Sequence, residues 1–172
     1  MADRAMADRA TADRAMADRS DAPHILVVEA RFYEDIADEL AKGASAELER
    51  QGASFEQVAV PGGFEIPAAI QMGVRSMEFY AARRRFDGYV ALGCVIRGET
   101  SHYEHICRES ARKLQDLACQ YALALGYGIL TCDTKEQAWE RARVDGRNKG
   151  GEAARACLRM IEIKRQFHLY PR

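Results

Sequence analysis

Residues 97–102 (RGETSH) combine polar and charged side chains in a pattern that can support proton transfer beside a bound anion. A glycine permits a tight turn after a predicted strand, and Thr100 or Ser101 can cap the helix that should follow. Free backbone N–H groups at such a helix start favour a phosphate. His102 then lies in the first helical turn, where the positive end of the helix dipole disfavours imidazolium and leaves a neutral imidazole for proton transfer. The competing interpretation is a capping turn with a surface histidine, and the negative charge of Glu99 argues against a pure phosphate cradle.

A second candidate for ligand binding is the segment 61–67 (PGGFEIP). Its two glycines let a ligand approach the backbone, Phe64 offers a face for stacking, and Glu65 can accept hydrogen bonds from ligand N–H groups. Phe32 extends from the first predicted strand and can stack on a planar ring. Taken alone, Phe32 is more simply explained by core packing. The segment 61–67 is equally compatible with an ordinary strand-to-helix turn that places Phe64 in the core.

Four cations lie around a predicted helix break, at Arg141, Arg143, Arg147 and Lys149. Such a stretch is usually a solvated face. It becomes a binding site only if another subunit or loop brings a phosphate to it.

The chain has five cysteines and four histidines. The cysteines are widely spread and form no CxxC pair, which argues against a disulfide framework or a structural zinc site. His102 and His105 are three residues apart, but this spacing is weak evidence for a metal without a nearby third ligand. We therefore expect no metal.

Alternating strands and helices must position these residues. Apolar runs and turn residues predict strands at residues 24–28, 55–60, 89–96 and 125–130, the last interrupted by Gly126 and Gly128. Helical periodicity and stop signals predict helices at residues 34–51, from about 67, at 101–123, 134–143 and 148–167.

Strands separated by helices of this length require crossover connections, which predicts an α/β fold whose parallel sheet has helices on both faces. Ligands of such folds bind beyond the carboxyl ends of the strands. That rule selects the segments 29–33, 61–65, 97–102 and 131–134.

Composition restricts the class of protein. A chain of 172 residues fits one domain, and 48% hydrophobic with 30% charged residues is ordinary for a soluble protein. A formal net charge of −1 gives no global field to recruit nucleic acid or an anionic membrane. No apolar run approaches the roughly 20 residues that cross a bilayer, and no apolar signal core is present. We expect a cytoplasmic protein with neither nucleic-acid nor membrane partners.

The first twenty residues repeat a five-residue unit: MADRA, MADRA, TADRA, MADRS. A period of five matches neither helix nor strand, so no continuous apolar face forms. We therefore expect a low-complexity, disordered tail at residues 1–22, a folded domain at 23–168 and a short C-terminal tail at 169–172.

The motifs resemble those of the lumazine synthase family over roughly residues 24–167. They occur in the family's order and spacing as Arg31-Phe32, PGGFEIP at 61–67, ALGCVIRGET at 91–100 with His102, YGILT at 127–131, EQA at 136–138 with Arg141, and NKG at 148–150. The PGGFEIP segment combined with residues 93–102 is highly specific. Tyr33 and Gly63 stand where the family usually has Asn and Ala, and Tyr127 where it usually has Phe.

The resemblance implies a flavodoxin-like three-layer sandwich with a four-stranded parallel sheet. It also implies a homopentamer, in some members part of a larger shell, with each active site between adjacent subunits. The implied reaction is the condensation of 5-amino-6-(D-ribitylamino)uracil with 3,4-dihydroxy-2-butanone 4-phosphate, which gives 6,7-dimethyl-8-ribityllumazine, phosphate and water in the penultimate step of riboflavin biosynthesis. The enzyme would be a transferase that needs no cofactor.

The resemblance also assigns roles to particular residues. His102 should transfer the proton, and Glu99 and Thr100 should border the sugar phosphate. Tyr127 and Arg141 of a neighbouring subunit should close the ring pocket and grip the phosphate. The ribitylaminouracil should be held by Phe32, Gly63, Phe64, Glu65 and the backbone of Cys94, Val95 and Ile96.

Two other classes of function fit the same scaffold. A riboflavin- or lumazine-binding protein without turnover would keep Phe32 and Phe64 but could lose His102 or Arg141. A purely structural shell protein would need neither. Because both His102 and Arg141 are present, the enzyme is favoured.

Overall fold

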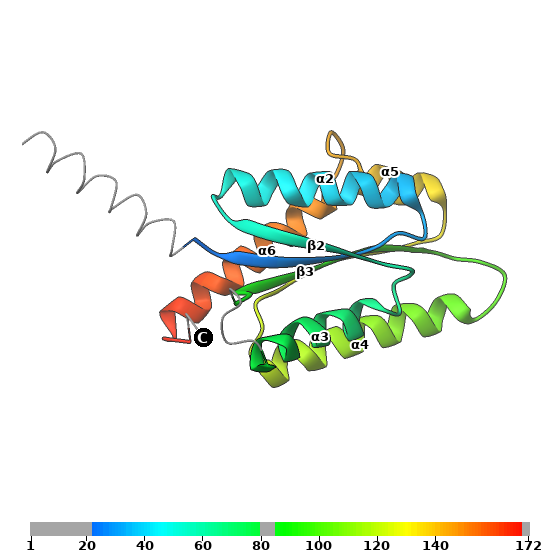
Figure 1. The fold of residues 1–172 in the computed structure, drawn as a ribbon. Coiled ribbons are helices and arrows are strands. Elements are labelled where there is room, and N and C mark those ends of the chain that lie inside the picture. Colours follow the sequence, from blue (N-terminus) through cyan, green and yellow to red (C-terminus); the bar gives the residue numbers. More distant parts are fainter. Residues whose placement is uncertain (1–21, 80–84, 170–172) are drawn as a thin grey trace, which may run out of the picture.

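The computed structural model describes residues 22–79 and 85–169 (Figure 1). The expected N-terminal tail lies outside these residues apart from Ala22, and so does most of the expected C-terminal tail. The strands are β1 His24–Ala30, β2 Ser54–Val60, β3 Gly88–Ile96 and β4 Leu125–Cys132. The helices are α2 Glu34–Arg50, α3 Ile66–Phe79, α4 His102–Tyr121, α5 Lys135–Ala142 and α6 Lys149–Gln166. Within the described residues, no helix is long and apolar enough to span a membrane.

The four strands form one parallel sheet in the order β2-β1-β3-β4. Helices α2, α5 and α6 lie on one face of the sheet, and α3 and α4 lie on the other (Figure 1). The predicted flavodoxin-like three-layer sandwich with a four-stranded sheet is confirmed. The strand order reverses direction between β1 and β3, and the carboxyl ends of strands at such a switch point are where open α/β sheets bind ligands.

Strand β1 shows why the short apolar run HILVV folds at the centre of the sheet. All seven of its residues are buried. Ile25 and Val27 pack into the core beneath α2 and α6, whereas Leu26 and Val28 pack into the core beneath α3 and α4. Because successive strand residues point to opposite faces, a strand buried on both sides is apolar throughout rather than alternating. Each such side chain contributes roughly 1.5–3 kcal/mol on full burial.

Strand β4 is continuous from Leu125 to Cys132, so the predicted interruption at Gly126 and Gly128 is wrong. The two glycines instead allow α6 to approach the sheet closely. A Cβ on Gly126 would lie 2.0 Å from the backbone oxygen of Ala153 in α6. A Cβ on Gly128 would lie 2.9 Å from the Ala153 Cβ. The glycines therefore serve helix–sheet packing, not a break in the strand.

Gly126→Ala is expected to destabilise the fold by about 1–3 kcal/mol, the usual cost of forcing atoms into a packed core. The new methyl group cannot avoid the α6 backbone without moving the helix. Thermal unfolding followed by circular dichroism measures the effect. Gly98→Ala is the stability control, because a Cβ there meets no atom within 4 Å. Equal melting temperatures for both variants would contradict the packing argument.

Candidate functional site

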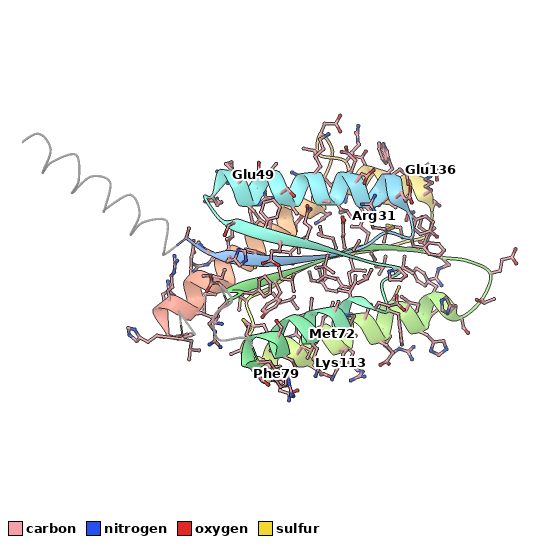
Figure 2. All side chains as sticks on the ribbon, in the orientation of Figure 1. Arg31, Glu49, Met72, Phe79, Lys113 and Glu136 are labelled. Carbon is pink, nitrogen blue, oxygen red and sulfur yellow. The ribbon has the colours of Figure 1, made fainter. Side chains whose placement is uncertain are left out.

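A groove of about 600 Å³ opens at the carboxyl ends of β1 and β3, at the switch point of the sheet. Figure 2 shows Arg31 after β1 and Glu136 in α5 at the same end of the sheet. Of the four segments predicted to bind ligands, those at 29–33, 61–65 and 97–102 line the groove, and the segment at 131–134 does not. Most of the residues expected to bind or convert substrate line the groove. They are Phe32, Gly63, Phe64, Glu65, Cys94, Val95, Ile96, Thr100 and His102.

Two aromatic rings stand exposed at the groove. Phe32 is 72% exposed and Phe64 is 56% exposed, so the core-packing alternative is wrong for both. Phe32 makes an edge-to-face contact with Tyr33, with ring centroids 4.9 Å apart. Large apolar side chains left in water beside a cavity are typical of a surface that binds a flat or apolar ligand.

The loop that carries Phe32 is held by ion pairs that sequence reasoning did not identify. Arg31 donates to Asp38 at 2.7 Å and to the buried Glu29 at 3.4 Å. These contacts, the hydrogen bond to Asp38 first, raise the pKa of Arg31. The backbone N–H of Arg31 also donates to Val60 at 3.1 Å, which ties the end of β1 to the end of β2.

His102 is the first residue of α4 and its side chain is exposed at the groove. Of the two predicted caps, Ser101 occupies the N-cap position, but within the described residues its side chain makes no capping hydrogen bond. Thr100 accepts only a long hydrogen bond, at 3.4 Å, from the His102 backbone. The first turn thus keeps N–H groups that can face a ligand.

The face of α4 that lines the groove extends beyond His102. Tyr103, His105 and Ile106 line it as well. Sequence reasoning did not assign these residues to the site, although His105 and Ile106, three and four residues after His102, share its helix face. Glu99 is exposed next to Thr100 but is not among the residues that line the groove.

Cys94 lies in the groove wall, yet its thiol is unsuited to chemistry. The residue is only 8% exposed, and burial raises the pKa of the thiol to about 12. The thiolate is the nucleophilic form of cysteine, so this side chain stays protonated and inert near neutral pH. Cys94 can therefore contribute to the groove only through its backbone and the volume of its side chain. Such a role agrees with the expected contact between its backbone and the ligand.

Tyr127 and Arg141 do not reach this groove. They line a second groove of about 300 Å³, between β4, α5 and α6, which also contains Lys149. Tyr127 is 43% exposed on the edge strand β4. Arg141 donates to the Gln137 backbone oxygen at 3.0 Å, and that bond leaves the rest of its guanidinium available. Within one chain, the residues that were expected to act together therefore lie in two separate grooves.

The fold and the two grooves define an α/β protein with a candidate ligand site at the switch point of a parallel sheet. The sequence model of the family described as 6,7-dimethyl-8-ribityllumazine synthase matches residues 22–165. A 6,7-dimethyl-8-ribityllumazine synthase of Bartonella tribocorum is 53% identical over 145 residues, covering 84% of this chain and 92% of that protein. The Agrobacterium fabrum enzyme of the same name is 51% identical over 145 residues, covering 84% and 97%. A 6,7-dimethyl-8-ribityllumazine synthase 1 of Rhizobium meliloti is 54% identical over 144 residues, covering 84% and 93%.

The chain belongs to the 6,7-dimethyl-8-ribityllumazine synthase family. The resemblance deduced from the sequence motifs is thereby confirmed.

Proposed function

We propose that the protein condenses 5-amino-6-(D-ribitylamino)uracil with 3,4-dihydroxy-2-butanone 4-phosphate and that the groove at the switch point holds the uracil. The reaction itself is supported by the chain's membership of the family over residues 22–165. The protein is a transferase of riboflavin biosynthesis that forms 6,7-dimethyl-8-ribityllumazine. The assignment of its residues rests on the geometry of the two grooves.

The first groove suits the ribitylaminouracil. Phe32 and Phe64 present exposed rings against which the flat heterocycle can stack. Glu65, exposed beside Phe64, can accept from hydroxyl or N–H groups of the ligand. The end of β3 at Val95 and Ile96, together with Gly63, brings backbone close to the ring edge.

The chemistry needs proton transfers rather than a cofactor. The 5-amino nitrogen bonds to the ketone carbon, and water leaves. A proton is then lost from the neighbouring carbon as phosphate leaves, and the resulting enol becomes a ketone and a methyl group. Attack of the ribityl-bearing nitrogen on this ketone closes the ring and expels water. His102, at the groove and in the first turn of α4, is the residue we assign to these proton transfers; one such group typically contributes about 10²–10⁴-fold.

The second groove supplies the other half of the site in our proposal. Arg141 can bind a phosphate bidentately, with Lys149 beside it, and Tyr127 can close over the ring. Because these residues lie apart from His102 within one chain, we assign them to the groove of an adjacent subunit in a homopentamer. Thr100, which lines the first groove, and the exposed Glu99 would then border the sugar phosphate from the opposite side.

The reaction is tested by mixing the purified full chain with both substrates. We expect lumazine fluorescence to appear with an equal amount of free phosphate, and neither signal when one substrate is omitted. Binding of lumazine or riboflavin without turnover would support the alternative of a flavin-binding protein. A chain that assembles but neither binds nor converts would support a purely structural shell protein.

We also propose that the enzyme works in the cytoplasm and that residues 23–168 form its working unit. The five cysteines are all free, as expected in a reducing compartment. The repeat at residues 1–20 and the end of the chain after residue 168 have no assigned chemistry.

Deletion of residues 1–20 should leave fold and activity intact, because a five-residue repeat gives neither helix nor strand a face to bury. Size-exclusion chromatography and the fluorescence assay, with the full chain alongside, measure the two properties. Loss of the soluble assembly on truncation would show that the repeat packs against the folded domain.

A further inference from the structure

The segment that leads from β3 to His102 is exposed and has few contacts of its own. Glu99 and Thr100 are exposed, and a Cβ built on Gly98 would meet no atom within 4 Å. Ser101 stands at the N-cap of α4, but its side chain caps no N–H group of the described chain. The direction in which α4 leaves the sheet, and with it the place of His102, must be held by other residues.

Arg97, the residue directly after β3, reaches three groups at once. Its Nε donates to Asp133 at 2.9 Å, and its terminal nitrogen Nη1 pairs with Glu104. Its guanidinium carbon lies 4.2 Å from the centre of the Tyr103 ring. Tyr103 and Glu104 directly follow His102 in the first turn of α4. A planar guanidinium suits this position, because it can donate to two carboxylates while it lies over an aromatic ring.

The partner outside α4, Asp133, belongs to the turn between β4 and α5, and this turn is itself held by several contacts. The Asp133 backbone N–H donates to the Gln137 side chain at 3.0 Å. The Arg97 backbone N–H donates to Cys132 at 2.9 Å. Lys135 pairs with Asp35 of α2 at 2.8 Å. The turn is therefore a fixed point to which the Arg97 side chain can attach α4.

We propose that Arg97 is a positioning residue for the condensation: it clamps the first turn of α4 to the β4–α5 turn and so holds His102 in place at the groove. This inference rests on the proposed function, because it acts through His102. Arg97 is not among the residues that line the groove, so its effect on substrate is indirect. Exposed ion pairs contribute little to stability, whereas a small displacement of a reacting group can be costly in rate. Turnover should therefore suffer more than the melting temperature.

The main test is Arg97→Met, which keeps an apolar stem and removes both ion pairs and the contact of the cation with the Tyr103 ring. We expect kcat to fall by about ten- to a hundredfold, as for a misplaced catalytic group. The KM values for both substrates should change by less than about threefold, because substrate-binding groups are untouched. Arg97→Lys keeps the positive charge but lacks the planar guanidinium that can donate to two carboxylates at once. This variant should recover part of the lost rate.

Two further variants keep the test decisive. Arg112→Met is the matched control, because Arg112 also pairs with two carboxylates, Glu109 and Asp116, but both belong to α4 itself; its kcat should equal that of the unmodified chain. Asp133→Asn leaves Arg97 in place and weakens only its contact with the β4–α5 turn. Asp133 is exposed, so this variant should fold even if Arg97→Met does not, and it should lose part of the rate.

A double-mutant cycle with His102→Ala separates positioning from general damage. If Arg97 acts through His102, Arg97→Met should slow the unmodified chain but add less than about a twofold loss in the His102→Ala background. An equal loss in both backgrounds, or unmodified kcat in both Arg97→Met and Asp133→Asn, would overturn the inference. The proposed function fails separately, if the unmodified chain does not convert the two substrates or if His102→Ala is as fast as the unmodified chain.

Discussion

Replacement of His102 by alanine is expected to slow turnover by about ten- to a thousandfold, the scale of one acid/base group. The reason is chemical: the condensation requires a proton to leave one carbon as phosphate departs, and His102 is the imidazole at the start of α4. The side chain is exposed, so its removal leaves no cavity and the assembly should persist. Steady-state kinetics with the fluorescence readout, beside size-exclusion chromatography, measures both properties.

His168→Asn is the matched control for this prediction. His168 is an exposed histidine after α6, and its positive φ of 57° is tolerated by asparagine. It should retain the unmodified rate. If His102→Ala is equally fast, His102 has no part in the mechanism, and His105, the other imidazole of the groove, becomes the candidate.

Local sequence patterns predicted the elements well, because their causes are local. The run HILVV gives a doubly buried strand, and each predicted element appears with no predicted end shifted by more than two residues. The rule that ligands bind beyond the carboxyl ends of parallel strands then placed Phe32 and His102 at one edge, and the structure has both in one groove.

What the sequence pattern could not predict depends on contacts between distant segments. Gly126 was interpreted as a break in a strand, because nothing in the local sequence shows that the backbone of Ala153 lies against it. The Arg97–Asp133 ion pair joins residues 36 positions apart, and an arginine after a strand gives no signal of its partner. Phe32 and Phe64 are exposed because they lie in the loops just before α2 and α3, which hydrophobicity alone does not reveal.

The separation of His102 from Arg141 within one chain leads to the prediction with the largest expected effect. Arg141→Ala should remove the bidentate contact with the sugar phosphate, and His102→Ala the proton transfer, so each variant alone should be much slower than the unmodified chain. If every site takes His102 from one subunit and Arg141 from the next, a mixture of the two variants creates some intact sites. With random exchange in a ring, about one interface in four, one half times one half, combines an unmodified groove with an unmodified Arg141.

The expected result is therefore a rise in activity after subunit exchange, toward about a quarter of the unmodified rate per site. The two variants are unfolded, mixed and refolded together, and exchange is verified by mass spectrometry of differently tagged chains. The control is the same mixture without exchange, which should give only the sum of the two residual rates. In a site built within one chain, every site of the mixture carries a lesion and no activity can return. An additive rate after verified exchange would thus eliminate the shared site, and with it the assignment of Tyr127 and Arg141 to a neighbour's groove.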